Sequence, residues 1–320
     1  MGVADYILYR MARNWPSPMA KMTKKLQAEP GTDAYHMAYA AQQFDYRVSN
    51  GISRSVRGLD VLEIGTGHGG IACFMAAVGA KSVVGIDLNT RDLRYAREFA
   101  RQLSEHYAPF KLPVEYAEMT ATKLSFRDAT FDLVFADNVF EHFTEPEEVM
   151  REAYRVLRPG GGLLVPVFSS IYSKYGLHLK HGLKLPWANV FFSERTIIRA
   201  MYRMAEIEPR IYDWYPGLSG DPKRVRDLRL YGDLNDITYH EFQRMAARTS
   251  FRVESFAPYG TRFGKVLSRV PLLGKSILMD VFSTGASAYL VKPGERTTPR
   301  PAQPAAATKV DALSGGGVHR

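Results

Sequence analysis

The sequence predicts an α/β protein with one seven-stranded sheet, helices on both faces of it and one inserted segment. Short apolar runs alternate with amphipathic stretches from Leu59 onward, which is typical of strands connected by helices. A glycine-rich turn directly follows the first run, as in sheets that bind a nucleotide. Residues 169–236 then interrupt the alternation, and they are too many for a plain connection inside a compact domain.

Seven apolar runs are predicted strands, five before the interruption and two after it. They are Asp60–Ile64, Ser82–Asp87, Val114–Ala117, Phe131–Ala136, Gly162–Phe168, Phe251–Ala257 and Ala286–Val291. Because helical stretches separate most of these runs, the pattern indicates a parallel sheet.

Two of the helices have a recognisable start. Thr144 precedes Glu147 by three residues, with Pro146 in the first turn, and Thr238 precedes Glu241 by the same spacing. A hydroxyl followed three residues later by Glu is the capping box of a helix N-terminus. We therefore expect helices to begin after Thr144 and after Thr238.

The chain divides into five predicted segments. Residues 1–58 form an N-terminal helical cover, 59–168 the core, 169–236 the insertion, 237–292 the completion of the sheet, and 293–320 a tail too poor in large apolar residues to fold. Within the fourth segment, residues 263–282 have apolar side chains at helical spacing. These side chains suit packing over the sheet or contact with a membrane surface.

Composition narrows the class of protein. The chain has 320 residues, a net charge of +9 and one cysteine, Cys73, so an internal disulfide and a cysteine-cluster metal site are excluded, and core packing is the expected role of Cys73. No signal segment or membrane-spanning run is apparent, which predicts a cytoplasmic protein. Lys and Arg exceed Asp and Glu between Lys174 and Lys275. That excess suits an anionic substrate, an acidic lipid surface, nucleic acid or simply a solvated face.

The glycine-rich turn predicts a nucleotide-type site. Gly65, Gly67 and Gly70 follow the first strand in GxGxxG spacing, and Asp87 ends the next strand 22 residues after Gly65. Glycines allow a tight turn and close approach of a ligand, and a carboxylate at that distance can hold ribose hydroxyls. On these features alone, a nicotinamide-dependent dehydrogenase remains an alternative.

Four motifs in order favour a different cofactor. Val61–Gly70, Val84–Asp87, Phe131–His142 and Leu157–Gly161 resemble the successive motifs of class I, Rossmann-like S-adenosylmethionine-dependent methyltransferases of the small-molecule, type 11 kind. The resemblance extends from about Leu59 to Phe168 and argues against a dehydrogenase. It implies S-adenosylmethionine as the cofactor.

The resemblance also implies a set of cofactor-binding residues. Gly65, Thr66 and Gly67 would cradle the methionine end, and Glu63 would support the loop or the amino group of the cofactor. Asp87 would hold the ribose hydroxyls. The remaining members, which would flank the adenine or border the methyl-transfer face, are Leu88, Thr120, Ala121, Asp137 and Asn138.

One of these positions departs from the family pattern. Thr120 stands where the family usually has an adenine-binding Asp. Its hydroxyl can accept the hydrogen bond of the adenine amine, but more weakly than a carboxylate does. Ala121 still offers a backbone N–H to the ring.

A histidine in the insertion is the predicted general base. His178 lies in the stretch Tyr175–Trp187, which resembles a substrate-side segment of small-molecule and glycan-type methyltransferases. Imidazole is suited to accept a hydroxyl proton near neutral pH. His181 is the weaker candidate, and His142 is expected to be structural. Aromatic side chains nearby would line a pocket for a sugar ring or acyl chain, or serve in packing; they are Tyr172, Tyr175, Trp187 and Trp214.

The leading hypothesis is therefore an O-methyltransferase for a small or glycan-like substrate, with the basic residues favouring an anionic one. A nucleic-acid methyltransferase is the first alternative, although no RNA-binding module or base-flipping signature is recognisable. A non-catalytic scaffold that binds S-adenosylmethionine is the second, because of Thr120. The histidines lack HxH or HExxH spacing, so no metal site is predicted, and the oligomeric state stays open.

Overall fold

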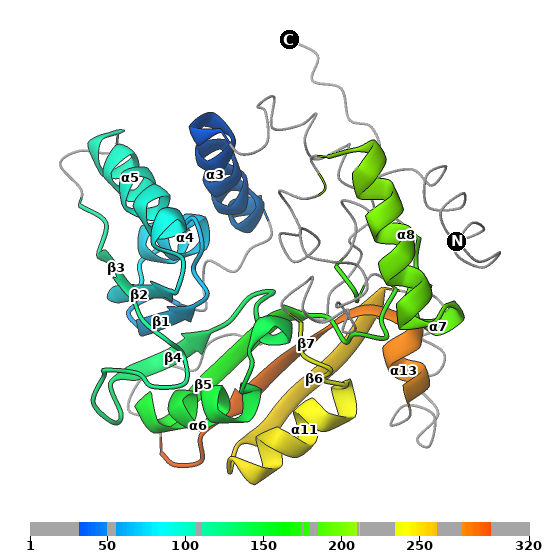
Figure 1. Cartoon of the computed structure of the whole chain (residues 1–320). Helices are drawn as coiled ribbons and strands as arrows, with labels where there is room; N and C mark the ends of the chain where they lie inside the picture. Colours follow the sequence, from blue (N-terminus) through cyan, green and yellow to red (C-terminus); the bar gives the residue numbers. More distant parts are fainter. Residues whose placement is uncertain are drawn as a thin grey trace, which may run out of the picture.

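A computed structural model describes residues 32–49, 56–106, 111–174, 176–178, 183, 185–209, 211, 234–260 and 277–295. Its centre is a seven-stranded sheet in the order β3-β2-β1-β4-β5-β7-β6 (Figure 1). The strands are β1 Asp60–Ile64, β2 Ser82–Asp87, β3 Val114–Glu118, β4 Phe131–Phe135, β5 Leu157–Phe168, β6 Arg252–Gly260 and β7 Ser283–Val291. All seven predicted strands are confirmed, most within a few residues of the expected ends.

The direction of the last strand departs from the parallel arrangement that the alternation of strands and helices indicates. Strands β1 to β5 pair with their neighbours in parallel, whereas β7 runs antiparallel to both β5 and β6. The direction of a strand depends on the route by which the chain returns to the sheet. An apolar run looks the same in either direction, so the sequence pattern carries no information about it.

Helices cover both faces of the sheet (Figure 1). One face packs against α4 Gly70–Ala77 and α5 Thr90–His106, with α3 Asp33–Ser49 resting on these two helices. The other face packs against α6 Pro146–Val156 and α11 Tyr239–Arg248. Each face has its own apolar core, because side chains alternate between the two faces along every strand. Cys73 is buried in the core beneath α3, as expected.

The two predicted helix starts have different outcomes. The Oγ1 atom of Thr238 accepts a hydrogen bond from the backbone N–H of Glu241 at 3.1 Å, which confirms that cap. The cap at Thr144 is wrong, since α6 begins one residue later, after Glu145, and no side chain caps it. Pro146 explains the difference, because a residue that precedes proline is held out of the helical conformation.

The described part of the insertion has a small core of its own. It contains α7 Ala188–Phe191 and α8 Glu194–Ile207, whose buried faces form an apolar cluster separate from the sheet. Of residues 263–282, only 277–282 are described, and Ile277–Val281 form the short helix α13. Residues 263–276, most of the N-terminal cover and nearly all of the predicted tail lie outside the described residues. None of the described helices is long and apolar enough to cross a membrane.

Candidate cofactor site and active site

The glycine-rich turn between β1 and α4 is bonded to the end of β2. The backbone N–H groups of Gly65 and Thr66 both donate to the carbonyl of Ile86, at 2.9 and 3.0 Å. Gly65 and Gly67 have φ angles of +72° and +50°, a region that residues with a Cβ rarely adopt. The turn is therefore held at the carboxyl edge of the sheet in a conformation that needs glycine.

Two positions of the motif require glycine for different structural reasons. A Cβ on Gly67 would meet no atom within 4 Å, so space is open above this residue. A Cβ on Gly70 would lie 2.2 Å from the carbonyl oxygen of Ala40 in α3. Gly67 thus leaves room for a ligand, whereas Gly70 permits the close approach of α3.

Asp87 connects the end of β2 to the turn. Its Oδ2 accepts a hydrogen bond from the backbone N–H of Gly67 at 2.9 Å, and its Oδ1 accepts one from Asn89, also at 2.9 Å. A carboxylate has about four lone-pair positions, so both oxygens can accept a further hydrogen bond. The next residue, Leu88, is 68% exposed, which is high for a large apolar side chain. Together these two side chains present a polar and an apolar contact at one strand end.

Glu63 supports the turn from inside the sheet. Its side chain is buried, and its Oε2 accepts a hydrogen bond from the hydroxyl of Thr66 at 2.7 Å. Thr66 is buried as well. A buried carboxylate needs such partners to offset the loss of water, so the pair holds the turn in place.

The loop after β3 lies beside Asp87. The backbone N–H of Met119 donates to the carbonyl of Asp87 at 3.1 Å, which joins this loop to β2. Thr120 follows and is exposed, and its hydroxyl forms a 2.8 Å hydrogen bond with the hydroxyl of Thr122. Ala121 is half-buried. The two predicted adenine contacts therefore lie at the strand end next to the predicted ribose contact.

Asp137 and Asn138 follow β4, the strand on the other side of β1. The backbone N–H of Asn138 donates to the carbonyl of Val167 in β5 at 2.8 Å, and Asn138 has a φ angle of 56°. Because β1 to β4 are parallel, their carboxyl ends meet at one edge of the sheet. All ten predicted cofactor residues lie at that edge, where open α/β sheets bind ligands.

His178 lies in a second group of polar side chains. Its Nε2 is 3.6 Å from Oε1 of Glu141, and its ring centroid is 5.1 Å from that of His142. Glu141 is 1% exposed and belongs, with His142, to the short helix η2 Phe140–His142. These three residues offer donor atoms close enough together to hold a metal ion. Glu141 and His178 lie 37 positions apart in the chain, so no local sequence signal indicates their contact.

A small pocket adjoins His178. Its lining includes Lys174, whose Nζ lies 5.7 Å from the ring centroid of Trp187, another lining residue. The indole Nε1–H of Trp187 donates to the carbonyl of Val281 at 2.6 Å, so one edge of this ring is fixed by packing. Among the other predicted aromatic and histidine candidates, Tyr175, His181 and Trp214 lie outside the described residues.

Known proteins are similar to the part of the chain that forms the carboxyl edge of the sheet. Residues 62–165 match a family model described as a methyltransferase domain. The ubiquinone biosynthesis O-methyltransferase of Rhizobium rhizogenes (strain K84) is 32% identical over 155 residues, which are 48% of this chain and 58% of that protein. Phosphoethanolamine N-methyltransferase 3 of Arabidopsis thaliana is 32% identical over 108 residues, 34% of this chain and 21% of that protein.

Among solved structures, an S-adenosylmethionine-dependent methyltransferase from Mesorhizobium loti is similar with a TM-score of 0.46 and 16% identity, over 74% of this chain and 92% of that one. The chain spans little more than half the length of the ubiquinone biosynthesis relatives that it matches. The matched region contains the glycine turn, Asp87 and the strand ends around them. Residues 62–165 thus match a methyltransferase-domain model, and they lie within a seven-stranded, Rossmann-like α/β sheet.

Proposed function

We propose that this protein transfers a methyl group from S-adenosylmethionine to a hydroxyl of a small or glycan-like substrate. The observation that carries the proposal is the meeting of four strand ends at one edge, where Gly67 leaves open space beside Asp87 and Leu88. Relatives named as O-methyltransferases support oxygen as the methylated atom.

In this proposal each strand end holds one part of the cofactor. The turn after β1, supported by Glu63, receives the methionine end, and Asp87 accepts hydrogen bonds from the ribose hydroxyls. Leu88 and Ala121 flank the adenine, which Thr120 contacts weakly. Asp137 and Asn138 border the transfer face; they follow β4 and lie next to the turn. When bound, the cofactor supplies a methyl group on a sulfonium, which an oxygen nucleophile attacks in line.

His178 is the proposed general base. Glu141 lies 3.6 Å from its Nε2. A carboxylate beside imidazole stabilises the imidazolium that forms when the ring accepts the hydroxyl proton of the substrate. Glu141 is thus the positioning residue for His178. The positive charge of Lys174 in the adjoining pocket favours a substrate that carries an anionic group.

The first test is the binding of S-adenosylmethionine, measured by isothermal calorimetry. We expect Asp87→Ala to weaken binding by roughly 10- to 100-fold, because hydrogen bonds to a charged group contribute about 1.5–3 kcal/mol. Asp128→Ala is the matched control, since this carboxylate is exposed in the loop before β4 and should leave affinity unchanged. Asp87→Asn retains one acceptor oxygen and separates loss of charge from collapse of the turn. The proposal fails if the wild-type protein does not bind the cofactor.

The second test identifies the class of substrate. The protein is incubated with methyl-labelled cofactor and fractionated cell extract, and the labelled fraction is identified. Label in a small hydroxylated molecule supports the proposal. Label in nucleic acid would favour the first alternative, and absence of any label beside normal cofactor binding would favour a scaffold.

A further inference from the structure

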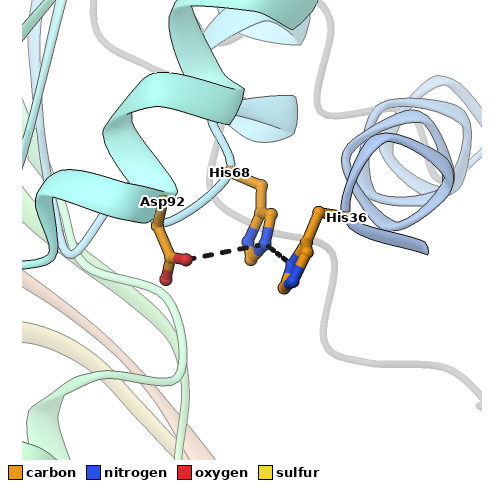
Figure 2. A group of neighbouring side chains, drawn as sticks. All are labelled: His36, His68 and Asp92. Atoms are coloured by element: carbon orange, nitrogen blue, oxygen red, sulfur yellow. Dashed lines mark hydrogen bonds and ion pairs between the residues drawn. The ribbon is translucent and has the colours of Figure 1, made fainter. Parts of the chain in front are cut away.

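We propose that His36, His68 and Asp92 form a binding site for one divalent transition-metal ion of the zinc class. The three side chains converge from α3, from the glycine turn and from the first turn of α5 (Figure 2). The site is separate from the group around His178, and the proposal does not depend on the methyltransferase activity.

The donor atoms of the three side chains lie within 4.8 Å of one another, close enough to bind one ion. Nδ1 of His36 is 2.6 Å from Nε2 of His68, and that same Nε2 is 3.7 Å from Oδ1 of Asp92. The two rings are nearly parallel, at 12°, with centroids 4.8 Å apart. Without a metal the two nitrogens share one hydrogen. Zinc lies about 2.0–2.1 Å from each nitrogen ligand, so the rings need to part by only about 1 Å to admit it.

The chemistry of the group suits a borderline metal ion. Two imidazoles and one carboxylate are a ligand set that zinc accepts, with a water as the fourth ligand. The side chains of His68 and Asp92 are only 14% and 22% exposed, which limits competition from bulk water.

Aromatic neighbours hold the two histidines in place. The ring of Tyr95 lies parallel to that of His36, with centroids 4.5 Å apart, and Tyr39 meets His68 edge-on at 5.4 Å. The hydroxyl of Tyr95 donates to Asp33 in α3. Side chains fixed by such packing lose little further freedom on binding an ion, which favours affinity.

An ion at this position would connect separate elements of the fold. His68 directly follows Gly67 in the turn, whereas His36 belongs to α3. An ion between them would fasten α3 to the turn and to α5. Because only the folded chain brings the three ligands together, binding should also raise the thermal stability of the protein.

The test is stoichiometric metal binding to the full chain after treatment with a chelator. Zn²⁺ is titrated in competition with a chromogenic chelator, and Co²⁺ is added separately to record its visible absorption. We expect one equivalent of Zn²⁺ that is lost or at least about tenfold weaker in His36→Ala and Asp92→Asn, because each removes one ligand. The Co²⁺ bands and the rise in melting temperature with Zn²⁺ should disappear in the same variants.

Two further variants make the outcome specific. His178→Ala alters the second histidine group and should retain this equivalent, and His240→Ala, at an exposed position on α11, should do the same. Asp92→Asn preserves the shape of its side chain, and melting temperatures measured in chelator establish that each variant is folded. The proposal is overturned if the wild-type protein binds no stoichiometric ion, or if the equivalent persists in folded Asp92→Asn and disappears in His178→Ala.

Discussion

At the scale of single residues, His178 combines an uncommon backbone conformation with a carboxylate neighbour. Its φ angle is +52°, in the left-handed region that few residues other than glycine occupy. A residue held in that region costs free energy, and such residues are concentrated at functional sites. The conformation and the contact with buried Glu141 agree with the proposed role as base.

His178→Gln tests this role through turnover. We expect kcat to fall by roughly 10²- to 10⁴-fold, the usual contribution of a general base, while the affinity for S-adenosylmethionine stays unchanged. The dependence of kcat on pH that arises from the base should also disappear. His240→Ala serves as the control histidine. Turnover of His178→Gln at the wild-type rate would assign His178 a structural role only.

At the scale of elements, Asn235 fixes the position of η2, which carries Glu141 and His142. Its Nδ2 donates to the carbonyls of Phe140 and Phe143, each at 2.9 Å, and its backbone N–H donates to the carbonyl of Glu141 at 2.8 Å. A single residue near the end of the insertion thereby holds both ends of η2. The proposed base and its carboxylate depend on this arrangement.

Asn235→Ala should therefore affect stability and turnover together. Loss of the amide leaves two carbonyls without this donor, and we expect a decrease of about 1–3 kcal/mol in the free energy of unfolding. Urea denaturation measures that change, and kcat measures the displacement of Glu141. Asp236→Ala at the exposed neighbouring position should change stability by less than about 0.5 kcal/mol. Equal effects of the two variants would contradict the role of Asn235.

At the scale of the whole molecule, the carboxyl and amino ends of the strands form two edges of the sheet with different roles. The carboxyl edge carries the candidate site, whereas a polar network joins four strands at the opposite edge. One nitrogen of Arg158 in β5 bonds Asp60 in β1 at 3.0 Å and Asp132 in β4 at 2.8 Å, and Ser82 in β2 donates to Asp60 at 2.8 Å. The side chain of Asp132 is only 3% exposed. This network stabilises the sheet away from the chemistry.

Arg158→Met tests that division of tasks. It leaves Asp132 buried without its cationic partner, and we expect a loss of about 1–3 kcal/mol, below the value for a fully buried pair because Arg158 is partly exposed. Cofactor affinity should not change. Lys81→Met removes the exposed partner of Asp60 and should cost less than about 1 kcal/mol. A large loss of cofactor affinity in Arg158→Met would show that the two edges are coupled.

Much of the fold was predictable because it depends on local patterns of residues in the sequence. The apolar runs placed all seven strands, since each run must bury its side chains in the sheet. The turn and Asp87 were predictable because glycine and a carboxylate at that spacing have few other uses. The wrong cap at Thr144 shows the limit of such patterns, since the adjacent Pro146 decided where α6 begins.

The sequence by itself determined the strands and the glycine turn, because these depend on residues that are neighbours in the chain or recur in a fixed order. Only the tertiary structure decided the direction of β7 and the partners of the histidines. His36 meets His68 because α3 packs beside the turn, and His178 meets Glu141 because the insertion returns to η2. Such contacts depend on how segments distant in the chain pack together. The spacing of residues within a short stretch of sequence contains no information about that packing.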